Sequence, residues 1–333
     1  MRRIVLAALI FLAIGPVPMQ TVRYTQDNFV QQAFARPLDA RQDPAGALHF
    51  VRGWQLTSPH SRFGGFSAVA RGGSDGFLLV GDNGYATRLR LDRSGPLALV
   101  RIAPLPVPDG WPDRKSMVDA ESLSVDPDTG ALWVGLERTN QLWRFDEAMT
   151  RLEARLAPAA MRDWPKGRGP EAMVRLADGR VVIFAEGGRR DPRSNRAVMF
   201  VGAPGKVMRP PVQFYYDSEG KGAISDAALL PDGRILLVHR KVGWNPVFTS
   251  TIAIADPVDI RTGAVLRSQT IGAVPRALAD NFEGAAVEVA DGRTYLWLVS
   301  DNNFQRWQRS LLVQFELIDL PPKRPADSKK AAR

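Results

Sequence analysis

Acidic and hydroxyl residues open five short apolar segments at a nearly constant interval along the chain. They are Ser67, Glu121, Glu171, Asp226 and Glu283, which are separated by 54, 50, 55 and 57 positions. Several carboxylates around one narrow space repel one another, and protonation, paired cations or a bound metal must relieve that repulsion. Hard oxygen ligands of this kind suit calcium. The residues therefore predict a calcium site wherever the fold gathers them.

A second set of polar residues ends the apolar segment that follows each opening residue. The set consists of Asp82 and Asn83, Glu137 and Arg138, Glu186 with Arg189 and Arg190, His239 with Arg240 and Lys241, and Asp301 with Asn302. Guanidinium groups hold phosphate well, because their planar forks match its geometry. A site with both carboxylates and guanidinium groups could bind a metal ion together with a phosphate ester.

The same residues also have a structural interpretation. Carboxylates at the starts of strands can accept hydrogen bonds from backbone N–H groups and pair with arginine of the next repeat, and such ion networks perturb pKa values as functional sites do. His239 is the one histidine of three at such a position, and we expect a structural role for it. A Ser-His-Asp hydrolase is therefore disfavoured, whereas hydrolysis by metal-activated water needs no nucleophilic side chain.

Paired strands are the elements that must position these residues. A tight turn with Gly separates the two apolar segments of every copy, at residues 74–76, 128–130, 177–179, 231–233 and 290–292. Such turns connect the strands of a β-hairpin. The strands are apolar at consecutive positions, which indicates sheets covered on both faces. Small antiparallel sheets packed face to face around an axis satisfy this requirement, so the repeat predicts a β-propeller.

We predict an all-β fold with a single propeller of five blades, because five copies are visible. Residues 156–169 and 256–280 are loosely patterned and leave a degenerate sixth blade as the alternative. The start of the first strand and the end of the second share one face of a blade, so both polar sets should meet at the mouth of the central channel. We expect outer strands at residues 98–102, 152–156, 212–216 and 264–268. The N-terminal residues 48–56 should complete the last blade and close the ring.

The ends of the chain differ in composition from its body. An 11-residue apolar run, residues 4–14, follows Met1-Arg-Arg and predicts an export signal or an uncleaved anchor within residues 1–20. Residues 21–47 form a leader segment, residues 48–320 the propeller domain, and residues 321–333 a solvated basic tail. We expect a periplasmic or secreted protein, tethered to a membrane only if the leader stays uncleaved.

Composition limits the partners. The 333 residues have a formal net charge of +9, and the tail contributes five cations and one carboxylate, so the body carries +5. This mild charge without a basic and aromatic strip argues against nucleic acid as a partner. A core of this size needs no disulfide, in keeping with the absence of Cys. We expect a monomer that acts on a small molecule.

Five short strings of residues together resemble the phytase-like domain family, also called the esterase-like activity of phytase family, over residues 63–317. The strings are Asp119-Ala-Glu121-Ser-Leu, Gly169-Pro-Glu171-Ala, Ser225-Asp226-Ala-Ala, Asp280-Asn-Phe-Glu283-Gly-Ala and Ser300-Asp301-Asn302-Asn303. The resemblance implies an exported propeller related to the calcium-dependent phytases, with hydrolysis of phosphate or other esters.

The resemblance also implies roles for individual residues. The implied catalytic residues are Glu121, Glu171, Asp226 and Glu283. The implied metal ligands are Asp82, Glu121, Glu171, Glu283 and Asp301. Apart from the resemblance, we expect Arg138, Arg189 and Arg240 to orient the anion of the substrate, with Asn302 as a further substrate-binding residue. Ser67 and His239-Arg240 depart from the carboxylates of the other copies, and either change could reduce a multi-metal site to one ion or to none.

Three functions follow from these observations. The first is an exported, calcium-dependent hydrolase of phosphate or carboxylic esters. The second is a non-catalytic binding or assembly propeller at the cell envelope that uses the same channel mouth. The third is a lactonase-type propeller, which holds one metal ion in the channel and differs from the first in its substrate.

Overall fold

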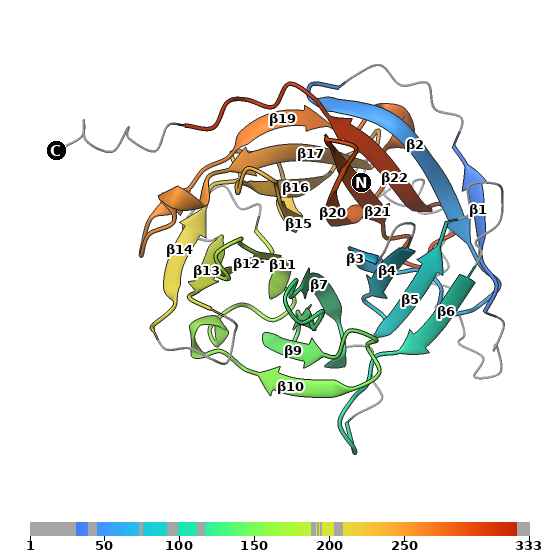
Figure 1. Cartoon of the computed structure of the whole chain (residues 1–333), viewed down its shortest axis with the longest axis horizontal. Coiled ribbons are helices and arrows are strands. Elements are labelled where there is room, and N and C mark those ends of the chain that lie inside the picture. Colours follow the sequence, from blue (N-terminus) through green and yellow to red (C-terminus); the bar gives the residue numbers. More distant parts are fainter. Residues whose placement is uncertain are drawn as a thin grey trace, which may run out of the picture.

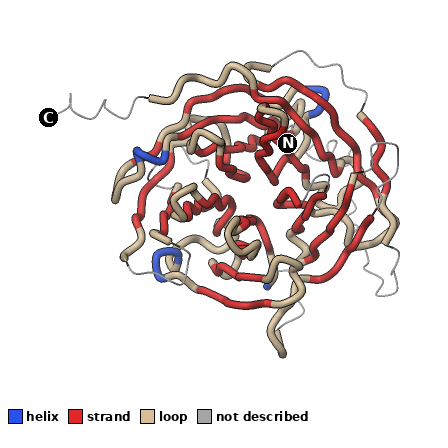
Figure 2. Tube along the Cα trace, in the orientation of Figure 1, coloured by secondary structure: helices blue, strands red, loops and turns tan. Residues whose placement is uncertain are grey.

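The computed structural model describes residues 31–38, 45–72, 76–91, 99–111, 117–187, 191, 193, 195–202 and 209–324. Five sheets, antiparallel except for one short parallel pair, stand around a central axis, and strands make up nearly all of the regular structure (Figures 1 and 2). The innermost strands of adjacent sheets contact one another in a closed ring. The prediction of an all-β propeller with five blades is confirmed.

Blades 1 to 3 take their strands in chain order from the axis outward. Blade 1 contains β3 (Phe66–Gly72), β4 (Gly76–Gly81), β5 (Tyr85–Arg90) and β6 (Leu99–Pro104). Blade 2 contains β7 (Ala120–Val125), β8 (Leu132–Leu136), β9 (Gln141–Phe145) and β10 (Leu152–Leu156). Blade 3 contains β11 (Pro170–Arg175), β12 (Val181–Ala185), β13 (Arg196–Phe200), β14 (Val212–Tyr216) and the short β18 (Val265–Leu266).

Blade 5 joins the two ends of the described chain. Blade 4 contains β15 (Ala223–Leu229), β16 (Ile235–Val242), β17 (Phe248–Ala255) and β19 (Gln269–Ala273). Blade 5 contains β20 (Phe282–Ala290), β21 (Arg293–Ser300), β22 (Ser310–Leu317), β2 (Leu48–Thr57) and β1 (Phe34–Pro37). Since β2 pairs antiparallel with β22, the predicted closure by an N-terminal strand is confirmed.

The two predicted end segments are only partly described. The strand β1 lies within the predicted leader of residues 21–47, and it pairs antiparallel with β2. The predicted signal or anchor of residues 1–20 lies outside the described residues. In the predicted tail, Lys323 Nζ donates to the carbonyl of Asp232 at 2.6 Å, and residues 325–333 lie outside the described part.

One predicted outer strand is wrong. We expected residues 264–268 to complete blade 4, but the outer strand of that blade is β19, which pairs with β17. Residues 265–266 form β18, which pairs in parallel with Tyr215 and Tyr216 of blade 3. The reason is burial: Leu266 packs with Phe214 and Tyr216 in the apolar cluster between blades 3 and 4. The chain therefore crosses to the neighbouring blade before it returns.

The core consists of five apolar clusters, one between each pair of adjacent blades. Strand β12 shows why the strands are apolar at consecutive positions. Val182 and Phe184 pack toward blade 4, whereas Val181 and Ile183 pack toward blade 2. Alternate side chains of one strand point to opposite faces, and each face is covered by another blade.

The helical content is small. It comprises the 3-10 helices η2 (Ala159–Met161), η4 (Pro257–Asp259) and η5 (Arg276–Leu278). None of the helices in the described ranges is long and apolar enough to cross a membrane. The loosely patterned residues 156–169 and 256–280 contain these helices and the strands β18 and β19, so they add no sixth blade.

Candidate functional site

The register between the first two strands of every blade shifts by one residue near the start of the inner strand. The residues at the shift are Ser67, Glu121, Glu171, Ser225 and Glu283, which we call the first ring. A β-bulge inserts one extra residue, bends the strand and re-aims a side chain. Five bulges at equivalent places therefore give the first ring its common position at one end of the channel.

The fourth member of the first ring is Ser225, whereas the sequence suggested Asp226. The side chain of Asp226 accepts hydrogen bonds from the backbone N–H groups of Ala227 at 2.8 Å and of Ala285 at 2.7 Å. Burial raises the pKa of Asp226 well above its ordinary value. This carboxyl group therefore joins blade 4 to blade 5, and it is not brought together with the glutamates of the first ring.

In each blade, the inner-strand residue just before the bulge pairs with a residue of the second strand. The residues that directly follow these partners in the chain form a second ring. Its members are Asp82, Glu137, Glu186, Arg240 and Asp301. In blades 1, 2, 3 and 5 the N–H of this residue donates to a carbonyl just before the inner strand, as Glu137 does to Asp119 at 2.9 Å. The described residues of the two rings thus contain seven carboxyl groups and one guanidinium group.

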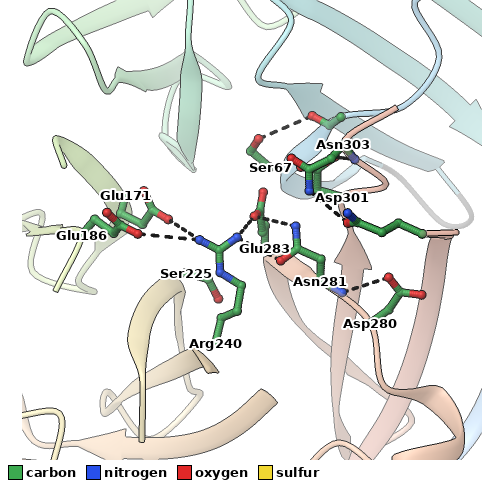
Figure 3. A network of polar contacts seen from close by, with 12 residues as sticks. Ser67, Glu171, Glu186, Ser225, Arg240, Asp280, Asn281, Glu283, Asp301 and Asn303 are labelled. Carbon is green, nitrogen blue, oxygen red and sulfur yellow. Dashed lines mark hydrogen bonds and ion pairs between the residues drawn. The ribbon is translucent and has the colours of Figure 1, made fainter. Parts of the chain in front are cut away.

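One side of the channel mouth is organised by Arg240 (Figure 3). Its guanidinium group donates to Asn281 Oδ1 at 2.9 Å and pairs with Glu283. It also lies 3.7 Å from Glu186 and 4.0 Å from Glu171. We call these five residues the Arg240 side. The side chain of Arg240 is 19% exposed, so its positive charge lies among the carboxylates and is largely shielded from solvent.

The other side of the mouth, in blade 2, has a different balance of charge. Asp119, Glu121 and Glu137 each offer a carboxylate oxygen, and these oxygens all lie within 4.8 Å of one another. We call them the blade-2 carboxylates. Arg138 Nε donates to Asp119 Oδ2 at 2.7 Å, but the side chain of Arg138 is 57% exposed. Solvent therefore weakens this ion pair, and among the described residues Arg138 is the one cation that pairs with the group.

Burial and repulsion from other carboxylates raise the pKa values of two of the blade-2 carboxylates. Burial, with repulsion from Glu171 and Glu283, raises the pKa of Glu121 well above its ordinary value. Burial and the nearby Asp119 raise the pKa of Glu137 to about 7. Glu121 and Glu137 cannot both be ionised at neutral pH without cost, so they can bind a cation or exchange a proton.

A pocket of about 620 Å³ shares Arg138 with the blade-2 carboxylates. Its lining combines cationic, polar and apolar side chains from Met117, Arg138, Thr139, Asn140, Ala157, Pro158, Arg162, Trp164 and Lys166. The Oγ1 atom of Thr139 is buried and makes no hydrogen bond to the described residues. Arg138 both lines the pocket and bonds Asp119, so it connects the pocket to the carboxylates.

The sequence matches the model of a known protein family. The family model described as Phytase-like, esterase-like activity of phytase, matches residues 61–304. The chain belongs to this family. The resemblance noted from the sequence is confirmed, and the match covers every residue of both rings. None of the curated proteins matches the sequence of this phytase-like chain.

Solved structures resemble the phytase-like chain only distantly. Glutaminyl cyclase from Myxococcus xanthus has 16% identity and a TM-score of 0.47, with 83% of this chain and 100% of that chain covered. A luciferin-regenerating enzyme has 9% identity and a TM-score of 0.44, with coverage of 88% and 87%. The Pan2 WD40 domain of Neurospora crassa has 12% identity and a TM-score of 0.38, with coverage of 79% and 93%. Likenesses this weak say nothing about what the phytase-like chain binds.

Several predicted site residues lie in the two rings. Glu121, Glu171 and Glu283 lie together in the first ring, and repulsion from the buried Asp82 helps to raise the pKa of both Glu121 and Glu283. Their predicted roles as ligands or catalytic groups stay predictions. Asp301 is 2% exposed, and its carboxylate accepts from the N–H of Asn303 at 2.6 Å.

The predicted substrate-binding residues have different surroundings. Arg138 is beside the pocket, whereas Arg240 is surrounded by its carboxylate partners. Asn302 Oδ1 accepts from the N–H groups of Gly65 and Phe304, both at 3.1 Å, so it fixes the joint between blades 5 and 1. Arg189 lies outside the described residues.

Sequence reasoning named four residues of the channel mouth neither as metal ligands nor as catalytic or substrate-binding residues, although it placed two of them, Glu137 and Glu186, in the second polar set. They are Asp119, Glu137, Glu186 and Asn281. A signal for correct alignment was nevertheless present: Glu121, Glu171 and Ser225 each precede the aspartate of the following turn by seven positions. Counting back from Asp232 would have given Ser225 instead of Asp226.

Proposed function

We propose that this protein is an exported hydrolase of phosphate or carboxylic esters that uses calcium at the blade-2 carboxylates. The observation that carries the proposal is the approach of three carboxylate oxygens, from Asp119, Glu121 and Glu137, to within 4.8 Å of one another beside the Arg138 pocket. Membership of the phytase-like family supports an enzymatic role of this kind. We place the protein in the periplasm or outside the cell.

The residues present fit calcium. Carboxylate oxygens are the ligands that this hard cation prefers, and a charged group of them favours it. When ionised, Glu121 and Glu137 carry negative charge that burial and neighbouring carboxylates make costly, as their raised pKa values indicate. A bound Ca²⁺ would offset this charge and polarise an ester oxygen. Asp119, Glu121 and Glu137 would hold it.

The chain's own residues account for binding and proton transfer. The carboxyl group of Glu137, with a pKa of about 7, can accept or donate a proton near neutral pH. Arg138 can orient an anionic part of the substrate through its guanidinium group. Trp164, Met117 and Pro158 offer apolar surface of the same pocket to the organic part of the ester.

The Arg240 side favours the second candidate, a non-catalytic binding propeller. One guanidinium group there contacts three carboxylates and Asn281, so these residues are satisfied without a ligand. If the blade-2 carboxylates were likewise only structural, the mouth would bind a partner without turnover. A lactonase-type propeller would share the calcium site and differ from the first candidate in its substrate.

The test measures turnover of p-nitrophenyl phosphate, p-nitrophenyl acetate and a lactone, with calcium or with a chelator. We expect calcium-dependent turnover of at least one of them. Glu137→Gln should lower kcat by about 100-fold or more, the range for loss of a general acid or base. The matched control is Glu153→Gln, because Glu153 is ion-paired with Arg144 and Arg151 on the outer strand β10.

Two results would contradict the proposed hydrolase. The first is turnover that stays unchanged when Glu121→Gln and Glu137→Gln are combined. The second is thermal stabilisation by a ligand with no turnover of any ester, which would support the binding propeller instead.

A further inference from the structure

An exposed aromatic patch borders the channel mouth on the side of blades 4 and 5. Trp244 is 89% exposed, Val242 68% and Trp307 56%. Of the eight tryptophans, all of which the structure describes, Trp244 and Trp307 are the two with large exposure. Soluble proteins seldom leave large apolar groups together in water, and such a patch marks an interaction site.

Three segments build the patch, and specific contacts hold them together. The turn between β16 and β17 supplies Val242 and Trp244, and its ends are closed by a bond from the N–H of Gly243 to the carbonyl of Val247 at 2.7 Å. The rings of Phe248 and Trp307 stack with centroids 6.0 Å apart and an interplanar angle of 3°. Arg276 Nη2 donates to Asn245 Oδ1 at 2.9 Å. The patch is therefore one surface and not three separate loops.

The charge of this surface has one sign. Residues 240–249, 274–279 and 302–309 contain no Asp or Glu. Lys241, Arg276 and Arg306 are exposed there, and they form no ion pair with any residue that the structure describes. The surface thus combines two exposed indole rings with three cations that carry no local counter-charge.

We propose that this aromatic patch binds an anionic lipid surface. Indole rings are enriched at membrane interfaces, since one edge is apolar and the N–H remains hydrated. Lysine and arginine beside them are attracted by anionic headgroups. Val242 lies two residues beyond Arg240 on β16, and Trp307 lies six residues beyond Asp301. Binding would therefore turn the mouth of the channel toward the lipid. The inference does not depend on the proposed hydrolysis.

The test measures co-sedimentation with vesicles of phosphatidylcholine and phosphatidylglycerol, and with vesicles of phosphatidylcholine alone. We expect association with the anionic vesicles, weakened by added salt. Trp244→Ala with Trp307→Ala should lower the partition coefficient by about ten-fold or more, because their apolar area no longer inserts. Lys241→Gln, Arg276→Gln and Arg306→Gln should each lower it by about five-fold.

Matched controls lie on the opposite face of the propeller. Val289→Ala removes an exposed apolar side chain, and Arg261→Gln removes an exposed cation, near the turns at the far ends of the blades. Both should leave the partition coefficient unchanged. Every variant is made in the full chain, so that the apolar residues 4–14 and the basic residues 321–333 contribute equally to all measurements.

A second measurement locates the contact. Brominated lipids should quench tryptophan fluorescence of the wild type, and Trp244→Phe should lose most of that quenching while binding persists. The proposal is overturned if the wild type does not bind anionic vesicles, or if the patch variants bind as the wild type does. It is also overturned if the patch variants alter only heparin binding or only the KM for a soluble ester.

Discussion

The two sides of the channel mouth have similar carboxylates, but the arginines that pair with these carboxylates differ in their exposure to solvent. On the Arg240 side, a guanidinium group with 19% exposure reaches Glu171, Glu186 and Glu283. In blade 2, the paired cation is Arg138, which is 57% exposed and contacts only the Asp119 member of its group. The three carboxylates of the Arg240 side therefore share a largely buried cation, whereas among the described residues the blade-2 carboxylates pair only with an exposed one.

The backbone does not cause this difference. Blades 2 and 4 each have a bulge near the start of the inner strand. In each of them, the second-ring residue directly follows the residue that pairs with the inner strand just before the bulge. The side chains alone differ, with Ser225 and Arg240 in blade 4 against Glu121 and Glu137 in blade 2. A repeated fold thus allows one position to serve structure in one repeat and chemistry in another.

Removing the buried cation should produce the largest effect. Arg240→Met leaves three carboxylates close together without their shared partner, and we expect a loss of about 3–5 kcal/mol in the free energy of unfolding. Urea denaturation measures this loss. Arg267→Met is the control, because that side chain is 71% exposed, and its effect should be small.

A double variant tests whether the stability lost in Arg240→Met comes from the carboxylates that are left without a cation. Combining Arg240→Met with Glu283→Gln should recover part of the lost stability, since one uncompensated charge disappears. A loss below about 1 kcal/mol for Arg240→Met, the range of exposed pairs, would mean that this side is not held by its cation.

The corresponding change in blade 2 should have the opposite sign. With a chelator present, Glu121→Gln removes a carboxylate whose pKa is raised by burial and repulsion. We expect the free energy of unfolding to increase by about 0.5–2 kcal/mol. Adding calcium should raise the free energy of unfolding of Glu121→Gln by less than it raises that of the wild type. Thermal or urea unfolding with and without calcium decides this, and destabilisation by Glu121→Gln in chelator would contradict it.

The pH dependence of stability should reveal the same charges. The pKa of Glu137 is about 7 in the folded protein against an ordinary value of 4.5, so the folded state binds its proton more tightly than the unfolded chain does. This contribution to stability is present below pH 4.5 and is lost as the pH rises toward about 7. Glu137→Gln should make the decline shallower in chelator. Urea titrations at several pH values measure it, and an unchanged slope would refute the assignment.

The smallest effect should come from the exposed cation. Arg138→Gln should change the free energy of unfolding by only about 0.2–1 kcal/mol, as is usual for an exposed pair. Calcium affinity should rise slightly, because a positive charge beside Asp119 is removed. Calorimetric titration measures the affinity, and a marked loss of calcium binding would assign Arg138 a larger role than its exposure suggests.

The architecture was predictable because it depends on repeated local features. Turns with Gly, consecutive apolar residues and the spacing of the copies define blades without knowledge of distant contacts. The outer strand of blade 4 was not predictable in this way. Residues 264–268 have strand composition, and whether they join blade 3 or blade 4 depends on the burial of Leu266 against Phe214 and Tyr216.

The site was predictable only in part. The convergence of Glu121, Glu171 and Glu283 follows from their place in the repeat, but the bulge that selects Ser225 over Asp226 is a property of strand pairing. The sequence also could not show that Arg240 reaches Glu283 of the next blade, because residues 43 positions apart meet only when blades 4 and 5 pack against each other.

Calcium titration of the two sides tests the central claim most directly. We predict that calorimetry detects saturable calcium binding to the wild type, and that Glu121→Gln weakens it by about ten-fold or more. Glu186→Gln, which changes a carboxylate of the Arg240 side, should leave the affinity nearly unchanged. Equal weakening by both substitutions, or no calcium binding to the wild type, would contradict the assignment of the cation site to blade 2.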